Sequence, residues 1–304
     1  ILKPDINELF KTEMDCDVEV GKSMSSIVGS KEYDKNPCRI LSEFHNEERG
    51  FAHAWFSVDI WGKKFKKIGN DGIPEILSSD ININGFLNII DAARLNNVDR
   101  LIYASSSSVY GDSVELPKVE DITGNVLSPY ALTKLVNEEQ AKVFSRTYGI
   151  DVIGLRYFNV FGSMQDPNGE YAAVIPKWIN SIMNQAPIEI FGDGNTSRDF
   201  CYIKNVIQAN FLAATTDNSN ALNQIYNVAF GGRTSLNDLF NIINATCRKF
   251  GFNYSLEPKY KDFRPGDIKH SNADISKIKK LLNYDPIYDV SKGLYETIRW
   301  YVES

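Results

Sequence analysis

The chain has 304 residues, enough to bury a sizeable core in one large domain or two modest ones. Its residues are 43% hydrophobic and 24% charged, and this composition excludes collagen-like, low-complexity and wholly disordered proteins. The formal net charge is −6. A mildly acidic chain is a poor candidate for binding nucleic acid or an anionic membrane, so we expect neither partner.

The four cysteines, Cys16, Cys38, Cys201 and Cys247, are scattered and form no CxxC pair. This spacing argues against a zinc site and against a disulfide framework. The three histidines form no HExxH or HxH pattern, so we expect no metal ion. No apolar run approaches the ~18 residues of a membrane span, and the charged first turns do not resemble a signal peptide. We expect a cytoplasmic protein with thiols in a reducing compartment.

From Ile76 onward, predicted helices and strands alternate with short connections, which is typical of an α/β fold. Ser128 and Ser235 are expected N-caps, and Gly149 is an expected helix end. In chain order, the expected elements are a helix over Ile83–Asn96, a strand over Arg100–Ala104, a helix from Pro129 to Gly149, a strand over Val152–Arg156, a helix over Ile175–Asn184, a strand over Pro187–Phe191, a helix over Asn205–Ala214, a strand over Gln224–Ala229, a helix from Ser235 to near Gly251, and helices that begin at Asp274 and Ser291.

The segment YALTK places Tyr130 and Lys134 in the first turns of a capped helix, on one face. A lysine cation beside a phenol favours the phenolate, so we expect a Tyr130 pKa below about 10 and a role as general base. A run of hydroxyls, Ser105 to Ser108, follows the strand before this helix, at the end where α/β folds place their sites. Taken alone, the pair also fits a solvated helix face, and the serines also fit an ordinary polar loop.

Several strings in this order and spacing carry a family resemblance: ASSSSVYG, SPYALTK, LRYFNVFG, SRDF and FRPGD. They resemble the extended short-chain dehydrogenase/reductase superfamily, the NAD-dependent epimerases and dehydratases of nucleotide sugars. Longer strings such as GLRYFNVFGSMQDPNGEYAAVIPKW and GDGNTSRDFCYI look closest to the bacterial UDP-N-acetylglucosamine 4-epimerases. The resemblance covers residues 76–304. It implies a Rossmann-like, doubly wound parallel sheet with a smaller C-terminal substrate-binding region.

The resemblance also implies an activity, which is NAD-dependent 4-epimerisation of UDP-N-acetylglucosamine and UDP-N-acetylgalactosamine through a 4-keto intermediate, for surface polysaccharide synthesis. It implies a homodimer with the Tyr130 helix in the interface. The implied catalytic residues are Ser106, Tyr130 and Lys134, and the implied cofactor contacts are Tyr130, Lys134 and Tyr157. The implied substrate contacts are Ser107, Ser108, Asn159, Ala173, Val174, Arg198, Arg264, Asp267 and Ser271.

Three positions refine the expected chemistry. Related dehydratases carry an Asp–Glu pair where this chain has Ser107 and Ser108, and serines do not titrate near neutrality, so dehydration is disfavoured. Ser271 stands where hexose-restricted epimerases tend to carry a bulky Tyr, so it leaves room for an acetamido group, or it only begins the next turn. The preference between acetylated and plain UDP-hexoses stays open.

The first 75 residues depart from the family pattern, because the GxxGxxG turn that cradles the NAD pyrophosphate is missing. A shifted reading frame, a divergent and inactive homologue, or a different local structure could each explain this departure. We assign residues 1–160 to an NAD-binding domain, with 1–75 unmatched, and 161–304 mainly to UDP-sugar binding. The alternatives are another UDP-sugar epimerase or dehydratase, and a defective UDP-sugar-binding homologue that lacks the cofactor half-site.

Overall fold

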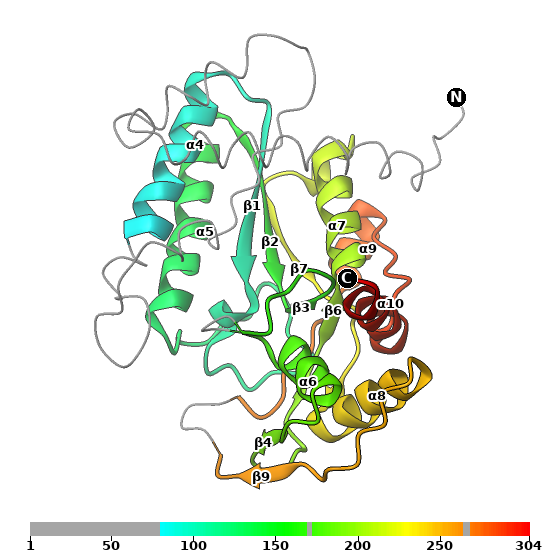
Figure 1. The fold of residues 1–304 in the computed structure, drawn as a ribbon. Coiled ribbons are helices and arrows are strands. Elements are labelled where there is room, and N and C mark those ends of the chain that lie inside the picture. The colour runs from blue at the N-terminus through cyan, green and yellow to red at the C-terminus, as the bar shows by residue number, and fades with distance from the viewer. Residues whose placement is uncertain (1–79, 169–171, 264–267) are drawn as a thin grey trace, which may run out of the picture. The chain divides into compact units, whose positions relative to one another are not determined.

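The computed structural model describes residues 80–168, 172–263 and 268–304 (Figure 1). All of them belong to one compact unit, Lys66–Ser304. Within these ranges, Cys201 and Cys247 are buried free thiols, whereas Cys16 and Cys38 lie outside them. The same ranges contain no cluster of His, Cys, Asp or Glu suited to a metal ion. In this part of the chain, no helix is long and apolar enough to cross a membrane.

Helices and strands alternate along the described chain. The helical elements are η3 (Asp80–Asn84), α4 (Gly85–Leu95), η4 (Ser107–Tyr110), α5 (Pro129–Tyr148), α6 (Val174–Met183), α7 (Ile203–Thr215), η5 (Ser219–Ala221), α8 (Leu236–Lys249), α9 (Ser276–Leu282) and α10 (Val290–Glu303). The strands are β1 (Arg100–Ser106), β2 (Asp151–Tyr157), β3 (Asn159–Phe161), β4 (Glu189–Phe191), β5 (Ser197–Arg198), β6 (Phe200–Tyr202), β7 (Gln224–Val228), β8 (Thr234–Ser235) and β9 (Lys259–Lys261).

A parallel sheet in the order β1-β2-β7 forms the centre of the described fold. The central strand β2 is buried along five consecutive residues, as a strand covered by helices on both faces requires. Gly154 in this strand is a site of close approach, because a Cβ there would lie 2.5 Å from the Tyr103 hydroxyl. The sheet confirms the expected α/β class.

Two layers of helices cover the sheet (Figure 1). Helices α4 and α5 lie on one face, and α7 lies on the other. Helix α5 begins and ends where the sequence indicates. Ser128 Oγ accepts the Ala131 amide at 3.1 Å, Pro129 is the first helical residue, and Gly149 closes the helix in the left-handed conformation at φ +74°.

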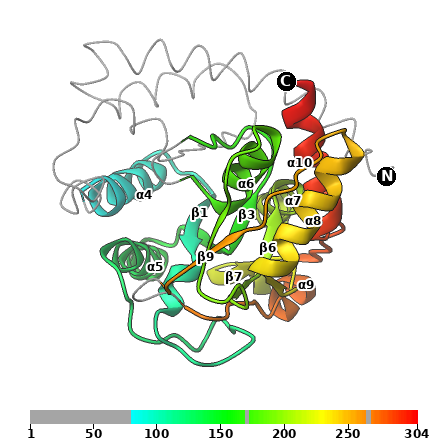
Figure 2. The same cartoon turned by 60° about the horizontal axis from the view of Figure 1, so that its bottom comes forward.

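The C-terminal part builds a second core from α6, α8 and α10 with the short strands β4 and β6. Figure 2 shows α8 alongside α10, on the opposite side of the sheet from α4 and α5. Strand β3 continues from β2 and pairs with β6, so the polypeptide passes directly from the central sheet into this second core.

The structure corrects the expected starts of the last two helices. Helix α10 is capped by Asp289, whose Oδ1 accepts the Lys292 amide at 2.8 Å, rather than beginning at Ser291. Helix α9 begins at Ser276, and Asp274 accepts the Ser276 amide at 2.7 Å from a position before the helix. Asp and Ser both make good caps, so composition alone does not select between neighbouring candidates.

Candidate active site

The run of serines forms a tight turn at the carboxyl end of β1. Ser106 ends the strand, and Ser107 and Ser108 begin the 3-10 turn η4. The Ser106 Oγ atom accepts the Ser108 amide at 3.2 Å and the Ser108 hydroxyl at 3.0 Å. The expected catalytic serine, Ser106, is therefore the residue whose hydroxyl oxygen accepts both hydrogen bonds from Ser108.

Tyr130 and Lys134 stand beside this turn in the first turns of α5, as the sequence predicts. The Lys134 Nζ atom donates to the Ala104 carbonyl of β1 at 3.2 Å and lies 5.9 Å from the centre of the Tyr130 ring. The Ser106 side chain is close enough to the Tyr130 phenol to affect its pKa. The structure therefore brings the three expected catalytic side chains together.

The pKa of Tyr130 differs from the sequence expectation. Burial raises the pKa of Tyr130 above its usual value, and the nearby Ser106 side chain opposes part of that rise. Since 44% of the Tyr130 surface stays exposed, solvent limits this effect. Burial also lowers the pKa of Lys134. The expected lowering of the Tyr130 pKa by Lys134 is wrong: the Lys134 ammonium donates to Ala104 and lies 5.9 Å from the centre of the Tyr130 ring, and burial determines the direction of the shift.

Two further expected contacts lie at the end of β2. Tyr157 is in register with Ser106, so the two residues occupy adjacent strand ends. The Tyr157 hydroxyl donates to Asn210 Oδ1 of α7 at 2.8 Å, and burial raises the pKa of Tyr157 to about 12. Asn159 follows at the exposed start of β3, where its amide donates to the Asp199 carbonyl at 3.2 Å.

A second group of expected residues assembles around Ser197. Arg198 donates to the Ser197 carbonyl at 3.0 Å, and the same carbonyl accepts the Ser271 amide at 3.1 Å. The Ser197 hydroxyl also contacts His270 and Arg233, at 2.9 Å and 2.8 Å. The pKa of His270 is lowered by burial and by the surrounding cations. Arg198 and Ser271 are thus held side by side in a basic environment.

The expected backbone contacts form the start of a helix. Ala173 is the N-cap of α6 and Val174 is its first residue, and Ala173 provides no capping side chain. The first amides of such a helix are donors without a partner within the helix, and they suit an anionic ligand. Arg264 and Asp267 lie outside the described residues, as do the unmatched first 75 residues.

A polar network that the sequence did not predict lies beneath the site. Glu138 and Arg156 form a buried ion pair, with Nε to Oε1 and Nη2 to Oε2 both at 2.8 Å, and Ser105 donates to Glu138 at 2.5 Å. The spacing along the sequence indicates that Glu138 lies near the site, because Glu138 is four residues after Lys134 and eight after Tyr130, on the same helix face.

The sequence of residues 74–229, just over half of the chain, matches the NAD dependent epimerase/dehydratase family. The chain belongs to this family. This membership agrees with the parallel sheet and its two layers of helices. NAD is the cofactor of the family.

Known UDP-sugar epimerases are similar to this chain over about three quarters of its length or more. A putative UDP-glucose 4-epimerase of Methanocaldococcus jannaschii is 40% identical over 74% of this chain and 70% of its own length. The solved UDP-N-acetylglucosamine 4-epimerase from Methanobrevibacter ruminantium, in complex with UDP-N-acetylmuramic acid, is 41% identical, with a TM-score of 0.69 over 74% of this chain and 70% of that one. The UDP-glucose 4-epimerase of Thermotoga maritima, solved with UDP-glucose, is 30% identical, with a TM-score of 0.70 over 83% and 76%.

The hydrogen-bond donors of Lys134 and Tyr130 fit the nicotinamide ribose of a bound NAD. Lys134 is half-buried and uses one of its three N–H donors on Ala104, which leaves donors for ribose hydroxyls. Tyr130 presents a partly exposed phenol next to that amine. The glycine-rich turn that would contact the pyrophosphate is missing from the sequence of the first 75 residues, and these lie outside the described residues.

Proposed function

We propose that this chain is an NAD-dependent UDP-sugar 4-epimerase that interconverts UDP-N-acetylglucosamine and UDP-N-acetylgalactosamine for surface polysaccharide synthesis. The observation that carries the proposal is the grouping of Ser106, Tyr130 and Lys134 at the end of β1. The solved relative at 41% identity supports the choice of an acetylated sugar, because it is a UDP-N-acetylglucosamine 4-epimerase.

In this proposal, NAD supplies the acceptor that takes and returns the hydride of the fourth sugar carbon. Tyr130 removes the proton of the 4-hydroxyl group, and Ser106 holds that oxygen through a hydrogen bond. Lys134 would bind the ribose through the N–H donors that Ala104 does not use. Once the 4-keto sugar had turned over within the site, Tyr130 would return the proton to the oxygen on its fourth carbon.

The substrate contacts are proposed on the second core. The start of α6 at Ala173 and Val174 offers backbone amides to UDP, and Arg198 offers a forked guanidinium to the diphosphate. Asn159 contacts the sugar nucleotide, and Ser271 borders the acetamido group. Arg264 and Asp267 complete this set from the sequence resemblance. Residues 161–304 would thus bind mainly the UDP-sugar, and residues 1–160 mainly NAD.

Ser107 and Ser108 weigh against the dehydratase alternative. Both lie in η4 next to Ser106, where elimination of water would require a further acid and base. Neither hydroxyl titrates near neutral pH, so the turn suits simple removal and return of a proton. A defective homologue that binds UDP-sugar without NAD is the other alternative, and release of nicotinamide cofactor from the heat-denatured protein would separate it from an epimerase.

The test of the proposed base is Tyr130→Phe, which removes only the hydroxyl group. We expect conversion of UDP-N-acetylglucosamine, followed by anion-exchange chromatography, to fall by about 10² to 10⁴. Calorimetric binding of the UDP-sugar should persist. Tyr148→Phe is the matched control, because Tyr148 is an exposed tyrosine at the far end of the same helix. Equal turnover in the wild type and Tyr130→Phe would contradict the assignment.

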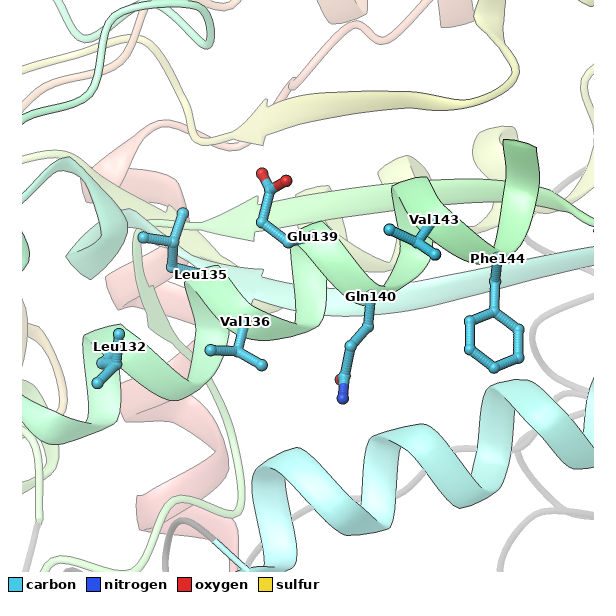
Figure 3. Close-up of a pocket in the computed structure, with 7 residues that line it drawn as sticks. All are labelled: Leu132, Leu135, Val136, Glu139, Gln140, Val143 and Phe144. Atoms are coloured by element: carbon cyan, nitrogen blue, oxygen red, sulfur yellow. The ribbon is translucent and has the colours of Figure 1, made fainter. Parts of the chain in front are cut away.

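A homodimer through α5 is part of the proposal. The outer face of α5 has an apolar hollow of about 400 Å³ beside α4 (Figure 3), lined by Leu132, Leu135, Val136, Glu139, Gln140, Val143 and Phe144. Leu132 is 49% exposed and Val143 is 56% exposed, and covering them with a second copy would bury apolar surface. We expect Leu132→Glu with Val143→Glu to yield a monomer by light scattering, whereas an unchanged mass would contradict this interface. We also propose a cytoplasmic location.

A further inference from the structure

A buried carboxylate connects the catalytic helix to both neighbouring strands of the sheet. Glu138 projects from α5 and is 0% exposed. Its two oxygens accept the Ser105 hydroxyl of β1 at 2.5 Å and two N–H groups of Arg156 from β2 at 2.8 Å each. One side chain therefore fixes the helix against the strand that ends in the serine turn.

The partner of Glu138 extends the connection to the serine turn itself. The Arg156 guanidinium lies 4.8 Å from the centre of the Tyr110 ring, and Tyr110 ends η4. The Tyr110 hydroxyl donates to Asn227 Oδ1 of β7 at 2.6 Å. Arg156 also donates to the Glu120 carbonyl at 2.9 Å. The helix, the turn and the strands β1 and β2 thus meet at one buried pair, and Tyr110 links the turn to β7.

The ion pair between Glu138 and Arg156 favours a fixed geometry. Burial would lower the pKa of Arg156, but the hydrogen bonds and charge of Glu138 outweigh burial and raise it. Arg156 therefore keeps its charge, and the bidentate pair that it forms with Glu138 restricts orientation as well as distance. Glu138 follows Lys134 by one helical turn and Tyr130 by two, about 6 Å and 12 Å along the axis.

We propose that Glu138 is a positioning residue for the reaction, which acts through Ser105 and Arg156 to hold Tyr130 and Lys134 at their working distance from the serine turn. This inference rests on the proposed function and deepens it. Glu138 touches neither Tyr130 nor Lys134 directly. Its effect on the reaction is the placement of α5, since a displacement of about 1 Å near reacting groups can reduce a rate about 10²-fold.

Two variants test this proposal without removing the buried charge. Ser105→Ala removes one hydroxyl and leaves the ion pair intact, and Glu138→Asp keeps the charge but retracts the carboxylate by one methylene. We expect kcat to fall at least about tenfold in both, with KM for the UDP-sugar within about twofold. The deuterium isotope effect with UDP-sugar labelled at the fourth carbon should rise, because a misplaced base slows the chemical step.

Thr297→Val is the matched control, because it removes a buried hydroxyl that donates to the Gly293 carbonyl at 2.8 Å in α10. Unchanged kcat and isotope effect in both variants, or equal changes in the control, would overturn the proposal. Hydrogen exchange gives a readout that does not need activity. Peptides covering residues 104–110 and 128–136 should exchange at least about tenfold faster in Ser105→Ala and not in the control.

The two measurements separate the two proposals. If the wild-type protein interconverts no UDP-sugar, the proposed function fails, and hydrogen exchange alone decides whether Glu138 positions α5. If the wild type is active and exchange in Ser105→Ala matches that of the control, the positioning role is wrong and the proposed function stands.

Discussion

Replacing Glu138 by Gln isolates the stability that the buried ion pair contributes. The substitution keeps the shape of the side chain and removes its charge. It also replaces one acceptor oxygen by an amide group that donates, and this amide then faces the N–H groups of Arg156 or the hydroxyl of Ser105. Arg156, with only 3% of its surface exposed, is left as an uncompensated buried cation.

The expected size of this effect follows from that burial. Removing one partner of a buried ion pair typically destabilises a protein by about 3 to 5 kcal/mol, because the remaining charge has lost both water and its partner. For a described unit of this size, such a loss lowers the melting temperature by roughly 10 °C. Adding Arg156→Met removes the uncompensated charge, so the double variant should recover about 2 to 3 kcal/mol relative to the sum of the single variants.

Urea unfolding followed by far-ultraviolet circular dichroism measures these free energies of unfolding. Glu296→Gln is the control, because Glu296 pairs with Arg299 at 2.6 Å on the partly exposed face of α10. Exposed pairs contribute about 0 to 1 kcal/mol, so the control should unfold almost as the wild type does. A loss below about 1 kcal/mol in Glu138→Gln, or strict additivity with Arg156→Met, would refute the reasoning.

Three further predictions concern substrate choice, pH and the cofactor. Ser271→Tyr should lower kcat/KM for UDP-N-acetylglucosamine about ten- to a few hundredfold relative to UDP-glucose, because the ring fills the volume of the acetamido group; an unchanged ratio would place Ser271 away from that group. Burial raises the pKa of Asp199 from 3.8 to about 6, even though its carboxylate accepts three backbone amides. The folded state therefore binds an extra proton between these values, and the free energy of unfolding should fall by about 2 to 3 kcal/mol as pH rises through them. Asp199→Asn should lack this dependence, and parallel pH curves for the two proteins would contradict it. Heat-denatured protein should release nicotinamide cofactor in proportion to its epimerase activity, and active protein without cofactor would exclude the proposed mechanism.

Local chemistry was enough to predict the long elements. Helix α5 could be placed to the residue because Ser128, Pro129 and Gly149 each act within one turn of a helix end. The short strands β3, β5, β6, β8 and β9 were not expected, since two or three residues carry no periodic signal and become strands only through a distant partner. Strand β3, for example, is defined by its pairing with β6, about forty residues later in the chain.

By itself, the sequence determined the α/β class, the family and the joint presence of Ser106, Tyr130 and Lys134 at one strand end. These depend on residue type and on spacing along the chain, which the sequence states directly. Only the tertiary structure decided the environment of those residues. The pKa of Tyr130 rises because of burial, and the ammonium of Lys134 is bound to Ala104. The burial of Glu138 and its bonds to Ser105 of β1 and Arg156 of β2 could not be predicted from the sequence. They depend on which strands lie side by side in the fold.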